Sequence, residues 1–367
     1  MAEDGLLKNG ISGHVQNRKE NNVKDIQIVL PGVVLGLAAI GLAAFCQPTV
    51  AAPPVDGVPR HADTLSKPPR PDHVVIVVEE NKAFRQIMGN VAAPYINRLA
   101  GKGALFTRSF AVTHPSQPNY LALFAGATYG VVDDRCLSSL SGDNLASELI
   151  RRGLSFATYS ESLPVTGFTG CRAGYYARKH NPAVNWQGVN LAPDVNQPFS
   201  AFPSDYSNLP AVSIVVPNQL NDMHHGPPQQ AIRRGDQWLE DHLDSYVRWS
   251  VRHNSLMILT WDEDDGSGDN RIVTIFAGPM VERGVYDARI DHYNVLRTII
   301  DMYDLRPLGK TTGKSAIRNI WRSERTSDRS DITGRDFSEE RGGVPVSDHI
   351  QPFVSVHQPP AARGTLK

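Results

Sequence analysis

Residues 73–78 (HVVIVV) place five consecutive β-branched residues after a histidine. A strand with one wet face alternates apolar and polar residues, so this unbroken run predicts a strand buried on both faces, as in a parallel sheet covered by helices. Residues 212–216 (VSIVV) and 255–261 (SLMILTW) have a similar character, and amphipathic helical patterns lie between the runs. We therefore expect an α/β fold with a doubly wound, mostly parallel sheet and helices on both faces.

The remaining elements are predicted from the same periodicities. Strands are expected at 73–78, 104–111, 154–159, 212–216, 255–261 and 271–277, and helices at 95–101, 144–152, 232–251 and 293–303. Residues 160–210 are rich in Gly, Pro and Asn and show no clear periodicity. We expect them to form a long functional excursion held by Cys171.

The chain of 367 residues is long enough for one large α/β domain or two small ones. Residues 26–45 are almost wholly apolar and follow Arg18, Lys19 and Lys24, which predicts a secretion signal over 1–52, with an uncleaved N-terminal anchor as the alternative. Either places the folded part outside the cytoplasm. A proline-rich linker is expected over 53–72, the folded domain over 73–322, and a polar, loosely ordered tail over 323–367.

Charge and cysteine content narrow the possible partners. Lys and Arg number 37 against 38 Asp and Glu, for a net charge of −1, so nothing favours nucleic acid as a partner. Cys136 and Cys171 are the two cysteines beyond the predicted signal. In an oxidising compartment we expect them to form a disulfide, the alternative being two free thiols.

Residues 113–126 (THPSQPNYLALFAG) carry the best candidate nucleophile. Ser116 precedes Pro118, and the apolar residues that follow predict the first turn of a buried helix. The unpaired backbone N–H groups at a helix N-terminus favour an anion. Ser116 is therefore either a helix cap or a nucleophile that faces a phosphate.

Polar clusters follow three of the predicted strands. They are Glu80-Asn81, Asp222-Met223-His224 and Asp262-Glu263. The carboxyl ends of parallel strands share one edge of the sheet, where so many acids and imidazoles would repel or desolvate one another unless a cation neutralised them. Singly, the first cluster could cap a helix, the last could be a solvated turn, and His292 could be a core histidine. Together they predict a divalent metal site of uncertain identity and number.

The predicted chemistry is attack on phosphorus. Ser116, beside the cation, would attack a phosphoryl group in line and form a phosphoserine, which water would then hydrolyse. His114 would either donate a proton to the leaving alkoxide or make a hydrogen bond within its loop.

Six motifs in order resemble one family: HVVIVVEEN (73–81), THPSQPNYLALFAG (113–126), YARKHNP (176–182), DMHHG (222–226), TWDEDDG (260–266) and DHYNVLR (291–297). They are similar to those of the bacterial acid phosphatase and phospholipase C phosphoesterase family of the alkaline-phosphatase superfamily. The likeness spans about residues 73–321 and is greatest to secreted mycobacterial members.

The resemblance implies roles for named residues. Glu80, Asn81, Ser116, Asp262 and Glu263 would hold a metal, and Asp222, His224 and His292 would bind a second metal or the phosphate. His225 stands where the family often has aspartate, which leaves the choice between His224 and His225 open. Arg178, Lys179 and His180 would hold a substrate phosphate or else form an exposed basic run.

The implied activity is hydrolysis of phosphomonoesters, on phosphatidylinositol 3-phosphate or on phosphoproteins. A phospholipase C-type phosphodiesterase and a non-catalytic binding module on the same fold are the alternatives. A phosphate-ester substrate, with a phosphoinositide head group as one form, is the expected partner. Membrane contact is expected only through the N-terminal segment or a lipid substrate.

Overall fold

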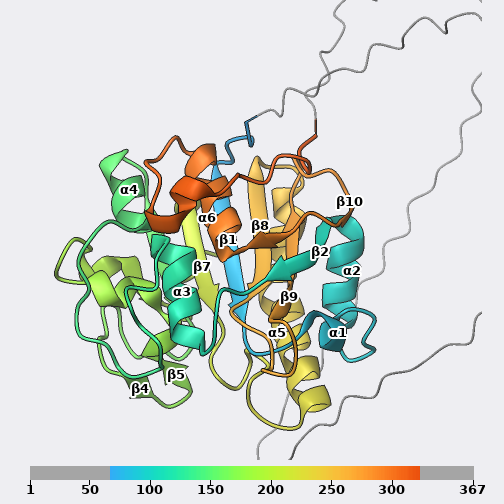
Figure 1. Cartoon of the computed structure of the whole chain (residues 1–367), viewed down its shortest axis with the longest axis horizontal. Helices are drawn as coiled ribbons and strands as arrows, with labels where there is room; N and C mark the ends of the chain where they lie inside the picture. Colours follow the sequence, from blue (N-terminus) through green and yellow to red (C-terminus); the bar gives the residue numbers. More distant parts are fainter. Residues whose placement is uncertain (1–66, 323–367) are drawn as a thin grey trace, which may run out of the picture. The chain divides into compact units, whose positions relative to one another are not determined.

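A computed structural model describes residues 67–322, and a central sheet organises this part of the chain (Figure 1). The strand order is β10-β2-β9-β8-β1-β7-β3-β6, with β11 paired to β2. In this described sheet β9 is antiparallel to its neighbours β2 and β8, and all the other strand pairs are parallel. The predicted fold class, a mostly parallel sheet, is confirmed.

The elements have the following bounds. The strands of the main sheet are β1 (His73–Glu79), β2 (Ala104–Phe110), β3 (Phe156–Ser160), β6 (Asn196–Pro198), β7 (Val212–Val216), β8 (Ser255–Trp261), β9 (Arg271–Ala277), β10 (Gly284–Tyr286) and β11 (Ile290–Asp291), and a small hairpin joins β4 (Arg172–Ala173) to β5 (Tyr176–Ala177). The helices are α1 (Phe84–Ile87), α2 (Pro94–Lys102), α3 (Ser116–Ala125), α4 (Leu145–Arg151), α5 (Pro228–Ser250) and α6 (His292–Met302).

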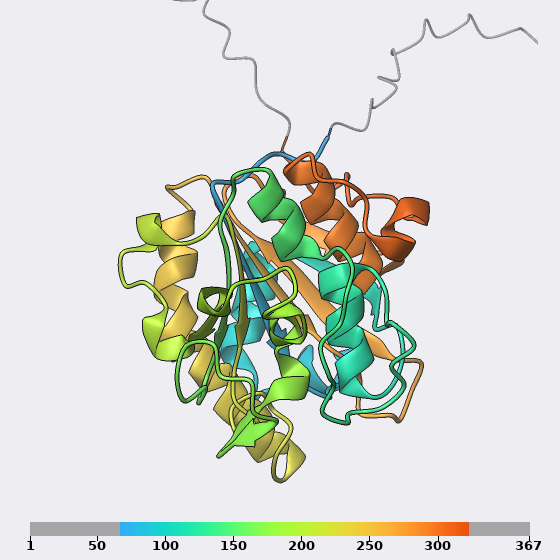
Figure 2. The ribbon, with the colours of Figure 1, turned by 90° about the vertical axis from the view of Figure 1, so that its left-hand side faces the viewer.

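Helices cover both faces of the sheet (Figure 2). On one face α3, α4 and α6 pack over Val74, Ile76 and Val78 of β1, and on the other α2 and α5 pack over Val75 and Val77. Each face of β1 therefore meets an apolar core, which is the physical reason for its unbroken apolar sequence.

Most predicted elements are confirmed with small changes in their bounds. The predicted helix 232–251 begins earlier, at Pro228, because a proline at the first helical turn needs no N–H partner. The short strands β6, β10 and β11 were not predicted, since two or three residues carry no measurable alternation.

The excursion between β3 and β7 contains the β4–β5 hairpin and several 3₁₀ turns, including η1 (Arg178–His180). The predicted disulfide is present: Cys136 and Cys171 are bonded, with their Cα atoms 5.6 Å apart. It joins this excursion to the segment after α3.

The predicted signal over 1–52, most of the linker and the tail over 323–367 lie outside the described residues. At the described end of the linker, the Tyr303 hydroxyl donates a hydrogen bond to the carbonyl of Pro71. Within residues 67–322, we find no helix that combines the length and apolar character needed to cross a membrane.

Candidate active site

The three predicted polar clusters meet at one edge of the sheet. β8, β1 and β7 are parallel neighbours, and Asp262, Glu80 and Asp222 follow their carboxyl ends. The backbone N–H of Glu80 donates to the carbonyl of Asp222 (2.8 Å), and that of Asp262 donates to the carbonyl of Glu79 (3.0 Å). The ladder thus continues past the strands and holds the clusters side by side.

Ser116 is the first residue of α3 and only 1% exposed. Pro115 occupies the cap position, and the Ser116 hydroxyl instead donates to Glu263 Oε1 at 3.0 Å. The capping alternative is therefore not what the structure shows. The hydroxyl points at an acid that can accept its proton.

Lys179, from the excursion, reaches the same hydroxyl. Its Nζ lies 3.4 Å from Ser116 Oγ and donates to Asp134 Oδ2 at 2.7 Å. The other oxygen of Asp134 accepts the backbone N–H of Gln117 at 2.9 Å. Burial acts to lower the pKa of Lys179, but Glu80 and Asp134 outweigh it and raise that pKa, which keeps the ammonium charged.

Glu80, His180 and Asp222 form a buried cluster whose nearest ligand atoms all lie within 4.8 Å of one another. His180 is in ion-pair contact with Glu80, and its Nδ1 lies 3.9 Å from Asp222 Oδ2. Burial acts to raise the pKa of Glu80, but the charge of His180 outweighs it and lowers that pKa to about 2. Burial and the charge of Glu80 raise the pKa of Asp222 well above its usual value.

Asn81, Asp262 and Glu263 form the adjoining half of the site. Glu263 Oε1 accepts from Asn81 Nδ2 (3.0 Å), and Asp262 Oδ1 accepts the N–H groups of Asn81 (3.3 Å) and Glu263 (2.7 Å). Asn81 has a positive φ of 44°, a conformation that asparagine tolerates better than most residues and that turns the chain sharply after Glu80.

Several buried oxygens of this site have no hydrogen-bond partner among the described residues. They are Glu80 Oε2, Asn81 Oδ1, Asp222 Oδ2 and Asp262 Oδ2, whereas Glu80 Oε1 contacts the ring of His180. Buried acceptors left unpaired are costly, and a group of carboxylate and amide oxygens with one imidazole suits a divalent cation. The residues present therefore fit the predicted metal, without deciding between one ion and two.

The remaining predicted histidines have different surroundings. The His114 ring contacts Glu263 and Asp264, which lie outside its own loop, and 43% of its side chain is exposed. His292 is buried and its Nε2 lies 2.7 Å from the carbonyl oxygen of Asp262, so it contacts backbone rather than the carboxylate cluster. His224 is exposed, and its ring contacts His225.

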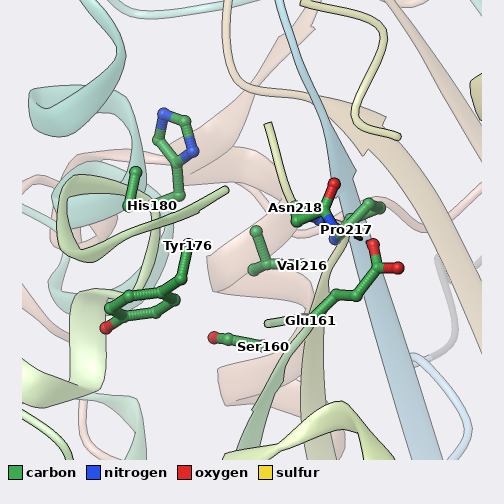
Figure 3. A pocket seen from close by; sticks show the side chains of 8 residues that line it. Ser160, Glu161, Tyr176, His180, Val216, Pro217 and Asn218 are labelled. Atoms are coloured by element: carbon green, nitrogen blue, oxygen red, sulfur yellow. Dashed lines mark hydrogen bonds between the residues drawn. The ribbon is translucent and has the colours of Figure 1, made fainter. Parts of the chain in front are cut away.

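The structure corrects the predicted role of one residue and adds another residue to the site. The sequence predicts that His180 holds a substrate phosphate or lies in an exposed basic run, yet it is buried in the carboxylate cluster. Figure 3 shows His180 and Tyr176 across a small hollow from Ser160 and residues 216–218, at the ends of β3 and β7. Asp134 was not predicted at all, because only the fold brings its loop to Lys179.

Comparison with known proteins agrees with the motifs. A model described as the phosphoesterase family matches residues 90–306. A phosphatidylinositol-3-phosphatase of Mycobacterium tuberculosis is 46% identical over 295 residues, covering 80% of this chain and 96% of that protein. A probable acid phosphatase of Kluyveromyces lactis is 31% identical over 266 residues, covering 67% of this chain and 61% of that protein.

A solved structure of a protein in the alkaline phosphatase superfamily, from Vibrio parahaemolyticus, aligns with a TM-score of 0.48 at 12% identity over 68% of this chain and 71% of that one. The family model covers more than half of the sequence, and the mycobacterial relative matches along nearly its whole length. This chain therefore belongs to the phosphoesterase family.

Proposed function

We propose that this phosphoesterase is a metal-dependent phosphomonoesterase in which Ser116 attacks phosphorus and carries the phosphoryl group as phosphoserine. The observation that supports this most directly is the Ser116 hydroxyl, buried at the start of α3 and hydrogen-bonded to Glu263. A hydroxyl held this way has an acceptor for its proton and a fixed direction of attack.

The surrounding residues divide the work. Glu263 accepts the Ser116 proton, and Asn81 Nδ2 orients the Glu263 carboxylate. The Lys179 ammonium lies where it can pair with the negative oxygens of a phosphoryl group. The backbone N–H of Gln117, near the start of α3, donates to Asp134 Oδ1 and is therefore not free to contact the phosphate.

Glu80, Asn81, Asp222, Asp262 and His180 would hold the divalent metal. Such an ion, when bound, supplies positive charge that offsets the negative charge of a phosphoryl group in the transition state. The positive charge of the ion would also offset the mutual repulsion of the carboxylates.

The preference for monoesters rests on cations. A phosphomonoester carries up to two negative charges, and Lys179 provides counter-charge beside Ser116. A phosphoinositide is the proposed natural substrate, on the strength of the name of the mycobacterial relative, with phosphoproteins as the other class.

We also propose that the protein is exported. The apolar segment 26–45 after basic residues supports this, and the Cys136–Cys171 disulfide is typical of an oxidising compartment.

The test is a phosphatase assay on residues 53–367, before and after chelation. Ser116→Ala should abolish phosphate release and leave the circular dichroism spectrum and thermal transition in place. Ser213→Ala is the matched control, since Ser213 is a buried serine of β7 whose hydroxyl has no hydrogen-bond partner among the described residues. That variant should keep wild-type activity.

Three results would contradict the proposal. Phosphate release by Ser116→Ala would show that Ser116 is not the nucleophile. Full activity after chelation and dialysis would show that the enzyme does not need a metal. Faster hydrolysis of phosphatidylcholine than of any monoester would favour the phosphodiesterase alternative.

A further inference from the structure

A second polar cavity lies beside the nucleophile. It has a volume of about 160 Å³ and is lined by Asp134, Arg172, Arg178 and Lys179, with the Cys136–Cys171 disulfide in its wall. Lys179 and Asp134 belong to both places, since the first contacts Ser116 and the second holds Lys179 and the N–H of Gln117. The cavity is therefore one side chain away from the reacting hydroxyl.

The cavity has more positive charge than its own residues neutralise. Asp134 pairs with Lys179, which leaves the two arginines. Arg172 is exposed and has neither an ion pair nor a side-chain hydrogen bond within residues 67–322. Arg178 donates to the carbonyl of Thr169 (2.8 Å) and to Asn185 Oδ1 (3.3 Å), both uncharged groups.

Arg178, the other arginine of the cavity, has no carboxylate partner within residues 67–322. Its Nε is buried and has no hydrogen-bond partner among the described residues, while its side chain is half-buried beside a second arginine. Removing a guanidinium from water without a counter-ion is unfavourable. A ligand with a negative charge in the cavity would supply the counter-charge that Arg172 and Arg178 lack.

We propose that this cavity is a subsite for a second anionic phosphate group on the same substrate whose phosphomonoester reacts at Ser116. The proposal rests on the proposed function, because it takes Ser116 as the reacting centre. The substrate class is a phosphomonoester that also carries a phosphodiester or second phosphate, held by Arg172 and Arg178 while Lys179 contacts the reacting group. A phosphoinositide head group has this chemistry, and so does its deacylated, water-soluble form.

The experiment compares two soluble substrates that differ by one glycerophosphodiester group. Inositol 3-phosphate has the monoester alone, and glycerophosphoinositol 3-phosphate adds a phosphodiester. In the wild-type full chain we expect the second to have the higher kcat/KM. In Arg172→Gln we expect the ratio of the two kcat/KM values to fall about tenfold, mainly through KM, as befits the loss of one charge-assisted hydrogen bond. Arg172→Lys should restore most of the ratio.

Arg283→Gln is the matched control. Arg283 is an exposed arginine just before β10, at the opposite edge of the sheet from Ser116, and its replacement should leave the ratio unchanged. An unchanged ratio in Arg172→Gln would overturn the subsite, whether activity on both substrates is retained or is lost equally.

Vesicles of phosphatidylinositol 3-phosphate in phosphatidylcholine separate the subsite from a membrane contact. The same fall in activity on vesicles and on the soluble diester supports the subsite, whereas a fall on vesicles alone overturns it in favour of a lipid-surface role for Arg172. Activity retained by Ser116→Ala would refute the proposed function instead, so the two failures are distinguishable.

Discussion

Neutralising Asp222 should change the stability of the metal-free and metal-loaded protein in opposite directions. The substitution Asp222→Asn keeps the Oδ1 acceptor for the N–H of His224 (2.9 Å) and the backbone bond to Glu80, but removes a negative charge from the Glu80 cluster. Without a cation, that charge opposes folding, because it lies buried beside another carboxylate. With a cation, the same charge contributes to binding.

The size of the effect follows from the geometry. Two unit charges separated by the 4.8 Å limit of the cluster repel by about 3.5 kcal/mol at an effective dielectric constant of about 20. The raised pKa of Asp222, caused by burial and then by Glu80, means that part of this cost is already avoided by protonation. We therefore expect Asp222→Asn to raise the free energy of unfolding by about 1–3 kcal/mol in chelator, or roughly 2–10 °C in Tm.

The assay is thermal unfolding in chelator and then with a series of divalent cations. A cation at a hundred times its Kd should stabilise the wild type by about 2.7 kcal/mol, or roughly 5–10 °C, and should stabilise Asp222→Asn much less. Asp236→Asn is the control, because Asp236 is a buried acid on the other face whose oxygens accept the N–H groups of Tyr95 and Ile96. It should lower Tm in both conditions and keep the full metal shift.

The reasoning would be refuted if Asp222→Asn unfolded at a lower temperature than wild type in chelator and still showed the wild-type shift with metal. A lower Tm in chelator alone would mean that contacts other than the Glu80 cluster decide the effect of Asp222 on stability. A wild-type shift with metal alone would mean that the ion binds elsewhere.

Two further predictions concern the disulfide beside the site and a buried carboxylate of α4. Opening the Cys136–Cys171 disulfide, by reduction or by Cys136→Ser, should raise KM as well as lower Tm, because the bond joins the loops of Asp134 and Lys179. An unchanged KM in steady-state assays would contradict this. Glu148 is buried on α4, and although burial acts to raise its pKa, hydrogen bonds from two arginines lower it. The Glu148 carboxylate should therefore stabilise the fold above about pH 4.5 and lose that effect as the pH falls through its lowered pKa. Glu148→Gln should lower the free energy of unfolding by about 1–2 kcal/mol at pH 7. Denaturant titrations should show this loss shrinking towards pH 3.

The sheet could be predicted because its information is local. β1, β7 and β8 are apolar at every position but one or two, and their burial on both faces is the direct consequence. The acids after these strands could be placed together for a similar reason, since parallel strands end at the same edge. Ser116 could be singled out from its position at a helix start, although its bond to Glu263 could not.

The contacts made by the excursion could not be predicted from the sequence. Residues 160–210 have no period, so nothing local places His180 against Glu80, Lys179 against Ser116, or Asp134 against Lys179. Those contacts join segments separated by 45 to 100 positions, and they depend on the disulfide and on the path of irregular turns.

Periodicity and strand-end chemistry, both readable in the sequence, determined the α/β class, the nucleophile candidate and most of the acidic cluster. Only the tertiary structure decided which histidine joins that cluster and which cations surround the serine. The reason is physical: burial patterns repeat along a chain, whereas the partner of a buried charge is selected by whatever the folded chain brings within a few ångströms of it.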